Sequence, residues 1–156
     1  MDIIEDDALV IIPPEGGALE LSIRQKTIGA SEIAALLGAS PWETAFSLYS
    51  KRIGKSAPDP ENSAMRRGRH LEAVAIEMLR EERPDWTVRA NPIPGGVFYR
   101  DLDAGISATP DAFVDAPGRP NGICQIKSVQ KFTFEKKWKN ENGEIEPPLH
   151  LSLIHI

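Results

Sequence analysis

The 156-residue chain contains a single cysteine, which excludes an internal disulfide and favours a reducing, cytoplasmic environment. Its three histidines are scattered, so the spacing of a zinc site is absent. It also lacks a glycine-rich phosphate loop and a nucleophile elbow. The apolar runs are too short to cross a bilayer, and the acidic first residues differ from the basic start of a signal peptide. We therefore expect a protein that does not enter a membrane.

Basic residues are missing from residues 1–20, which hold six of the 23 acidic residues. The remaining 17 acids nearly balance the 18 bases, so the rest of the chain is close to neutral. This balance permits DNA binding without predicting it. With 41% hydrophobic and 26% charged residues, the chain is typical of one globular domain. We expect residues 1–19, which end in a Pro- and Gly-rich stretch, to be an acidic flexible tail, and residues 20–150 to form the core.

Apolar spacing predicts four helices. They cover residues 31–38, 41 to about 54, 63–82 and 132–140, with Ser31 as the cap of the first and Gly38 as its stop. In the second helix we expect one apolar face (Ala45, Phe46, Leu48, Tyr49), and in the third a buried stripe (Leu71, Val74, Ala75, Met78, Leu79). Strands are predicted over residues 86–90, 96–100, 107–115 and 122–129. The order of elements predicts an α/β (α+β) domain with a small central mixed sheet flanked by helices.

The last two predicted strands carry the most informative residues. They flank a turn-rich segment and form a hairpin, which can bring Asp111 beside Gln125 and Lys127. Because side chains alternate along a strand, Gln125 and Lys127 share one face. An acid, an amide oxygen and an ammonium at one point can hold a hard divalent cation and polarise a water. The alternative is a set of polar residues on a half-exposed hairpin.

Glu72 is a further candidate, because it lies at the edge of the apolar face of the third helix. Burial of an unpaired carboxylate costs roughly several kcal/mol, so Glu72 needs a partner such as a cation.

Two other groups suggest anion binding. Arg24 precedes Ser31 by seven residues, and a helix start with a hydroxyl and a guanidinium can bind a phosphate. A plain helix cap beside a surface arginine is the simpler interpretation of these two residues. Basic runs lie before Glu72 and near the end of the chain, where they either face solvent or follow phosphates: Arg66, Arg67, Arg69, His70, Lys131, Lys136, Lys137 and Lys139.

Four motifs in this order resemble the YqaJ-like viral recombinases, relatives of phage lambda exonuclease in the PD-(D/E)xK nuclease superfamily. The resemblance covers roughly residues 22–150. The motifs are Arg24 with Ile28-Gly29-Ala30-Ser31-Glu32-Ile33, then Arg67-Gly68-Arg69-His70-Leu71-Glu72, then Thr109-Pro110-Asp111, then Gln125-Ile126-Lys127.

The resemblance implies a Mg²⁺-dependent exonuclease, with Mn²⁺ as a substitute, that digests linear duplex DNA from 5′ to 3′ in recombination by single-strand annealing. Asp111, Glu72, Gln125 and the Ile126 carbonyl would hold the metal, and Lys127 would orient the attacking water. The same resemblance implies that Arg24 and Ser31 bind the 5′-terminal phosphate of a DNA end. It also implies an annealing-protein partner, a homotrimer and a phage-encoded protein in the bacterial cytoplasm.

Two departures from the family pattern stand out. Gln125 replaces the usual glutamate, so the site keeps an amide oxygen but loses a charge that attracts the cation. The alternatives are therefore a weakened DNA-end-binding module, or another PD-(D/E)xK endonuclease. The family also continues beyond His150, whereas residues 151–156 resemble a translated sequencing adapter. We therefore expect a fragment that lacks its C-terminal part, the alternative being a natural helix end.

Overall fold

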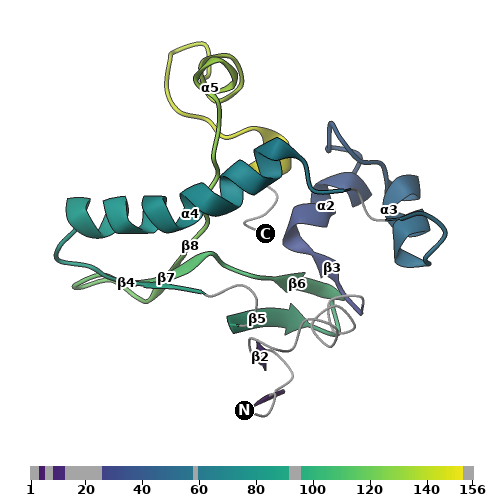
Figure 1. The fold of residues 1–156 in the computed structure, drawn as a ribbon, viewed down its shortest axis with the longest axis horizontal. Helices are drawn as coiled ribbons and strands as arrows, with labels where there is room; N and C mark the ends of the chain where they lie inside the picture. Colours follow the sequence, from purple (N-terminus) through teal and green to yellow (C-terminus); the bar gives the residue numbers. More distant parts are fainter. Residues whose placement is uncertain (1–3, 6–8, 13–25, 58–59, 92–95, 153–156) are drawn as a thin grey trace.

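The structure is a computed structural model that describes residues 4–5, 9–12, 26–57, 60–91 and 96–152. These residues form a mixed α/β domain (Figure 1). Its helices are α2 (Ala30–Leu36), α3 (Ala45–Arg52), α4 (Ser63–Glu82), α5 (Lys131–Lys137) and α6 (Leu149–Ser152). Its strands are β1 (Ile4–Glu5), β2 (Leu9–Ile12), β3 (Ile28–Gly29), β4 (Thr87–Ala90), β5 (Gly96–Asp101), β6 (Ile106–Ala108), β7 (Ala112–Asp115) and β8 (Gly122–Cys124). Among the described residues, no helix is long and apolar enough to span a bilayer.

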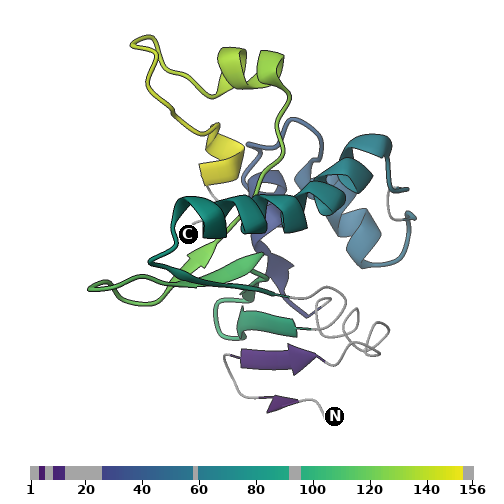
Figure 2. The ribbon, with the colours of Figure 1, turned by 60° about the vertical axis from the view of Figure 1, so that its left-hand side comes forward.

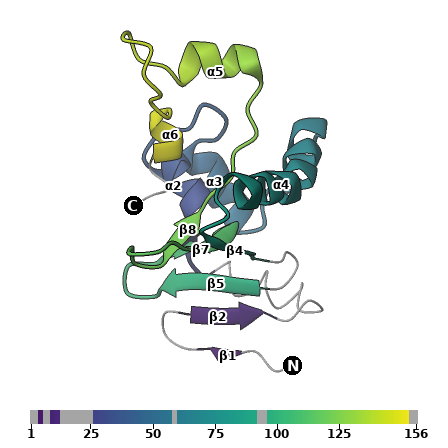
Figure 3. The same cartoon turned by 90° about the vertical axis from the view of Figure 1, so that its left-hand side faces the viewer.

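The strands form two sheets, where the sequence predicts one. The larger sheet has the order β1-β2-β5-β6-β3, and its strands are antiparallel except for the parallel pair β3 and β6. The smaller sheet, β4-β7-β8, is antiparallel. Figure 1 shows α4 running along the smaller sheet, and Figure 3 shows β5, β2 and β1 on the side of the molecule opposite α5.

The prediction of one strand over residues 107–115 is wrong. β6 ends at Ala108 in the larger sheet, and β7 begins at Ala112 in the smaller one. Pro110, which lies between them, has no N–H to donate and a fixed φ, so the ladder cannot pass through it. We call the segment Thr109-Pro110-Asp111 the seam, because it joins the two sheets. The predicted strand over residues 122–129 is also shorter, since β8 ends at Cys124.

Part of the predicted N-terminal tail belongs to the larger sheet. β2 pairs with residues 96–99 of β5, and β1 pairs with β2. The segments Ile4–Glu5 and Leu9–Ile12 contain β-branched residues, which favour strands. The remaining residues of the range 1–19 lie outside the described part of the chain.

Helix α2 begins one residue earlier than predicted, and Ser31 does not cap it. The N-cap is Gly29, whose N–H donates to Glu32 Oε2 at 2.7 Å. Glu32 supplies this bond because it occupies the third helical position, the place of the acid in a capping box. Gly38 ends the helix as predicted. Its φ of 70° suits glycine, and its N–H donates to the carbonyl of Ala35.

Helix α3 begins four residues later than predicted. Thr44 is its N-cap, because its side chain accepts from Ser47 N while the Ser47 hydroxyl oxygen accepts from Thr44 N. The predicted apolar face is mostly uncovered: Leu48 is 4% exposed, but Phe46 is 77% exposed. Spacing therefore identified the helix and not its buried side. An ion pair between Arg52 and Glu32 joins α3 to α2.

Helix α4 has the predicted bounds but a different buried side. Ile76 is buried and Leu79 is partly buried, whereas Leu71, Val74 and Met78 are exposed. Ile76 packs with Val88 of β4 and with Ala112 of β7. The stripe predicted from apolar residues alone is therefore rotated from the side that faces the smaller sheet.

The core cluster lies between α4 and the smaller sheet. Ile76, Val88 and Ala112 are its buried members. The partly buried residues that pack against it are Leu79, Trp86, Val114, Cys124 and Ile126. Helix α5 is shorter than the predicted range 132–140, and it lies on the side of α4 away from the sheets (Figure 2). The core cluster reaches the seam through Ala112, which directly follows Asp111.

Candidate functional site

The β7–β8 hairpin places Asp111 next to Gln125. Ala112 pairs with Cys124, and the pairing extends one step further through the Asp111 N–H, which donates to the Cys124 carbonyl at 3.1 Å. Gln125 Nε2 donates to Asp111 Oδ2 at 2.7 Å. The structure thus brings together two residues that are fourteen positions apart in the sequence.

The Asp111 carboxylate is buried and held by two donors. Its residue is 8% exposed, and Oδ2 accepts from Ile126 N–H at 2.5 Å as well as from Gln125. Hydrogen bonds from N–H groups stabilise a buried carboxylate that would otherwise be unfavourable. Both bonds use Oδ2, so the two carboxylate oxygens lie in different surroundings.

Ile126 meets Asp111 through its N–H. The sequence assigned its carbonyl to the site, and that role stays a prediction. The Ile126 side chain packs against the core cluster together with that of Cys124. Because β8 ends at Cys124, strand alternation does not extend to residues 125–127, and the shared face of Gln125 and Lys127 stays a prediction.

Glu72 reaches the same region from α4. Burial raises the pKa of Glu72 above its ordinary value of 4.5, and the Asp111 carboxylate raises this pKa further. The Lys127 ammonium acts in the opposite direction and lowers the pKa of Glu72. The charges of Asp111 and Lys127 therefore both act on Glu72, although Glu72 comes from a distant part of the sequence. A second effect of Asp111 is on Cys124, where burial and then this carboxylate raise the pKa of the thiol.

The second predicted constellation is only half described. Ser31 is exposed on α2, two residues after Gly29, which pairs with Ser107 of β6. Arg24 lies outside the described residues. The structure therefore places Ser31 near the strand that leads into the seam, and the pairing of Ser31 with Arg24 stays a prediction.

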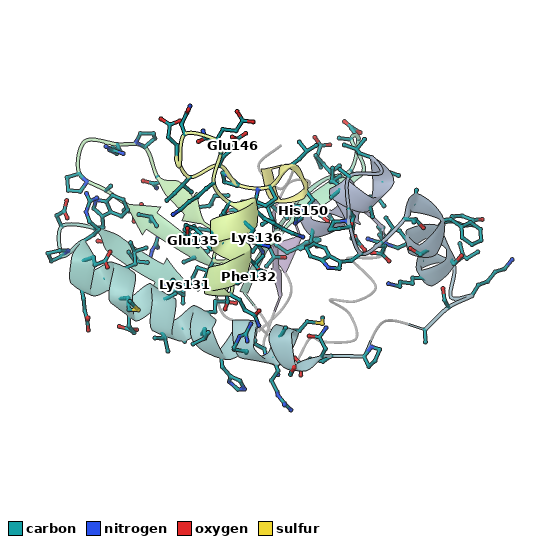
Figure 4. All side chains as sticks on the ribbon, turned by 90° about the horizontal axis from the view of Figure 1, so that it is seen from above. Lys131, Phe132, Glu135, Lys136, Glu146 and His150 are labelled. Atoms are coloured by element: carbon teal, nitrogen blue, oxygen red, sulfur yellow. The ribbon has the colours of Figure 1, made fainter. Side chains whose placement is uncertain are left out.

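Most of the predicted basic side chains lie on two helices, and Lys139 follows the second of them. Arg66, Arg67, Arg69 and His70 are exposed on the first half of α4, where Arg69 pairs with Glu61 at 2.6 Å. Figure 4 shows Lys131, Phe132 and Lys136 on α5, which lies over α4 in this view from above. Lys136 Nζ lies 4.4 Å from the centre of the exposed Phe132 ring. Lys139 is paired with Glu135 at 2.7 Å.

Sequence reasoning missed Asn91, which follows β4 directly. Its N–H donates to the Asp111 carbonyl at 2.9 Å, and its side chain donates to the Pro110 carbonyl at 2.9 Å. Its place at the end of the predicted strand over residues 86–90 was the one available signal. Its partners lie about twenty residues away, so local pattern did not reveal them.

The donor set fits a hard divalent cation. Asp111 and Glu72 supply carboxylates, and burial followed by the Asp111 charge raises the pKa of Glu72, so Glu72 gains from a nearby cation. Carboxylate, amide and carbonyl oxygens are the ligands that Mg²⁺ binds, and Mg²⁺ usually keeps several waters. No group of three His, Cys, Asp or Glu side chains with metal-binding geometry occurs among the described residues, so the set rests on two carboxylates.

These residues define a class of protein before any comparison: a mixed α/β domain with a buried aspartate where two sheets meet, whose charge, like that of a nearby lysine, acts on a second carboxylate. Residues 21–152 match the family model of the YqaJ-like viral recombinase domain. Because this match covers well over half of the chain, the protein belongs to the YqaJ-like viral recombinase family. No curated protein and no solved structure matches the chain.

Proposed function

We propose that this protein is a Mg²⁺-dependent exonuclease that digests linear double-stranded DNA from 5′ to 3′ in phage-type recombination by single-strand annealing. The observation that carries the proposal is the buried Asp111 carboxylate, which accepts from the Gln125 amide and from Ile126 N–H, directly before Lys127. Membership of the YqaJ-like family supports the same function.

The proposal includes a PD-(D/E)xK core. Asp111 follows the proline of the seam, and Lys127 follows two residues after Gln125 on the neighbouring chain segment. This arrangement supports the assignment. The motif has an acidic residue on one segment, and on the next segment an acidic or amide residue that is followed two positions later by lysine.

Glu72, Asp111, the Gln125 amide oxygen and the Ile126 carbonyl would hold Mg²⁺, with Mn²⁺ as a substitute. A bound divalent cation would supply positive charge to the phosphodiester and lower the pKa of a bound water. For Gln125 to offer its oxygen, its amide must turn, because Nε2 now donates to Asp111. The carboxylates of Asp111 and Glu72 supply the negative charge that attracts the cation.

Lys127 is the cationic group of the proposed reaction. Its positive charge lowers the pKa of Glu72, which supports a role for this ammonium near that carboxylate. Negative charge grows on the phosphodiester oxygens as the attacking water approaches phosphorus, and a nearby ammonium stabilises that charge. Lys127 would also orient this water by hydrogen bonding.

DNA would be held by groups outside the carboxylate cluster, the name we use for Asp111 and Glu72. Arg24 and Ser31 would bind the 5′-terminal phosphate. The exposed basic side chains of α4 and α5 would contact the phosphates along the DNA backbone. A single-strand annealing protein would take the 3′ overhang. Assembly into a homotrimer and action in the cytoplasm of a bacterial host, with the gene carried by a phage, complete the proposal.

The test uses Asp111→Ala and, as a matched control, Asp115→Ala in the same hairpin. Asp115 pairs with Arg89 at 3.3 Å on the far end of β7, so its loss leaves the carboxylate cluster intact. We expect Asp111→Ala to lower Mg²⁺-dependent digestion of linear duplex DNA by about a hundredfold or more, and Asp115→Ala to leave it unchanged. Undiminished digestion by Asp111→Ala would overturn the assignment. Cutting of closed circular DNA would instead indicate an endonuclease.

One observation favours a second candidate, a DNA-end-binding module with a weakened metal site. The Gln125 amide occupies Asp111 Oδ2 with a hydrogen bond, where the family pattern has a carboxylate. This candidate binds DNA ends to the same extent with and without Mg²⁺ and hydrolyses none. Binding and digestion measured on one linear duplex separate the two.

A further inference from the structure

Asn91 follows the last residue of β4, and it lies beside Asp111, which precedes the first residue of β7. Ala90 pairs with Ala112, and Ala112 pairs with Cys124. One step further, Asn91 N–H donates to the Asp111 carbonyl at 2.9 Å, and Asp111 N–H donates to the Cys124 carbonyl at 3.1 Å. The backbone of Asp111 is therefore held from both sides, by Asn91 and by Cys124.

The Asn91 side chain is buried, and it holds the seam directly. The residue is 3% exposed. Nδ2 donates to the carbonyls of Pro110 and Val97, each at 2.9 Å, and Oδ1 accepts from Val97 N–H at 2.7 Å. An asparagine amide has two N–H groups to donate, and both are used here.

The two partners of this amide belong to different parts of the fold. Val97 lies in β5 of the larger sheet, whereas Pro110 lies in the seam, which leads into β7 of the smaller sheet. Figure 1 shows β6 and β7 following one another across the molecule, with the seam between them. Asn91 thus fixes the seam to the larger sheet where the ladder is interrupted.

The orientation of the seam determines where the Asp111 carboxylate lies. The Pro110 carbonyl and the Asp111 N–H belong to the same peptide plane, and this plane is held by Asn91 Nδ2 at one end and by Cys124 at the other. Rotation of this plane would move the Asp111 side chain away from Ile126 N–H. Because Asn91 does not contact the carboxylate, its effect passes through the peptide.

We propose that Asn91 is the positioning residue of the site: its side-chain amide fixes the Pro110–Asp111 peptide and so holds the Asp111 carboxylate in the orientation in which it meets Ile126 N–H and would bind the proposed metal. The metal part of this inference rests on the proposed function, whereas the aim of the carboxylate does not. Groups that orient a ligand typically change metal affinity by about 10- to 100-fold when they are removed.

The experiment compares Asn91→Ala and Asn91→Asp with Asn62→Ala. Aspartate at position 91 keeps an acceptor for Val97 N–H but loses both donors. Asn62 is a matched control, because its side chain accepts from Ala64 N and Met65 N at the start of α4 and does not touch the seam. For each chain, folding is followed by circular dichroism, the Ile126 amide by NMR without metal, and Mn²⁺ affinity by electron paramagnetic resonance of the free ion.

We expect both Asn91 variants to shift the Ile126 amide resonance upfield, because this N–H loses its carboxylate acceptor, and to weaken Mn²⁺ binding about tenfold or more. Asn62→Ala should lower only the unfolding temperature. A folded Asn91→Ala chain with an unchanged Ile126 resonance and unchanged Mn²⁺ affinity would overturn the inference.

Two further outcomes are decided by the unaltered chain. If neither Asn91 variant folds, the Asn91 side-chain amide resonances are followed during a Mg²⁺ titration: a shift supports the inference, and no shift while the Ile126 amide responds refutes it. If the unaltered chain binds no Mn²⁺, the proposed metal site fails, and the response of the Ile126 amide to Asn91→Ala alone decides whether Asn91 positions Asp111.

Discussion

At the scale of single residues, the chemistry of this protein concentrates on one buried carboxylate. Asp111 Oδ2 accepts from Ile126 N–H and from the Gln125 amide, and Asp111 also raises the pKa of Glu72. Gln125 therefore has two effects. It holds the Asp111 carboxylate by donating to Oδ2, and in the proposed metal site it would supply an amide oxygen where a glutamate would supply a charge.

Gln125→Glu should reverse both effects. In metal-free buffer, a second carboxylate would replace the donor at Asp111 Oδ2, and we expect the free energy of unfolding to fall by about 1–3 kcal/mol. Mg²⁺ should bind more tightly, because the site gains a charge, and should restore stability. Thermal unfolding with EDTA and with Mg²⁺ measures both changes. Gln130→Glu, at an exposed glutamine, is the control; equal stability of the two variants in EDTA would contradict the prediction.

Glu72 should make stability depend on pH. Its pKa is raised above 4.5 in the folded chain, so the folded state keeps this proton to a higher pH than the unfolded state. The free energy of unfolding therefore falls as pH rises from 4.5 through the raised pKa. Glu72→Gln removes this loss, so its unfolding temperature relative to the unaltered chain should increase across that window.

The measurement is thermal unfolding in EDTA at pH values below and above this window. Glu81→Gln, at an exposed position of the same helix, is the control. A relative unfolding temperature of Glu72→Gln that does not change with pH would show that Glu72 has its ordinary pKa, and would remove the evidence that it interacts with Asp111.

At the scale of elements, helix boundaries were predictable where the sequence contains local signals. The bounds of α4 were predicted because a long periodic segment ends just before Pro84. The starts of α2 and α3 were wrong. Each start depends on a side chain, of Glu32 in α2 and of Ser47 in α3, that accepts a hydrogen bond from the backbone N–H of the N-cap residue.

Substitutions at Ser31 and Glu32 should therefore have different effects: the change at Glu32 should affect stability, and the change at Ser31 should affect DNA-end binding. Glu32→Ala removes the acceptor for Gly29 N–H and an ion pair with Arg52, and should lower the free energy of unfolding by about 1 kcal/mol or more. Ser31→Ala should change stability by less than about 0.5 kcal/mol. If Ser31 binds the terminal phosphate, Ser31→Ala should reduce the preference for 5′-phosphorylated over 5′-hydroxyl duplex ends. A large loss of stability in Ser31→Ala would contradict this account.

The buried side of α4 can be tested in the same way. Ile76→Ala should reduce the free energy of unfolding by about 2–5 kcal/mol, because Ile76 fills the core between Val88 and Ala112. Val74→Ala, on the exposed side of the same helix, should change it by less than about 1 kcal/mol. Urea unfolding measures both. A larger loss of unfolding free energy for Val74→Ala than for Ile76→Ala would indicate that the side of α4 predicted from the sequence is the buried one.

At the scale of the whole molecule, the residues of the candidate site could be predicted from the sequence, but the arrangement of the two sheets around them could not. The hairpin that brings Asp111 to Gln125 was predicted, because its turn and alternation are local. The division into two sheets was not. It depends on the pairing of β4 with β7 and of β5 with β6, which no local pattern specifies.

Asn91 shows the same limit in one residue. It lies where β4 ends, and its amide joins the larger sheet to the seam through Val97 and Pro110. A single asparagine before a turn is ordinary in a sequence, and its role follows only from the packing of distant strands.

We expect the junction of these two sheets to form a nuclease site. The most direct test is Mg²⁺-dependent release of nucleotides from linear, 5′-phosphorylated duplex DNA, measured with the unaltered chain, Gln125→Glu and Asp111→Ala. We predict release by the unaltered chain, at least as much by Gln125→Glu, and none by Asp111→Ala. Failure of both the unaltered chain and Gln125→Glu to release nucleotides, or equal release by Asp111→Ala, would contradict the account.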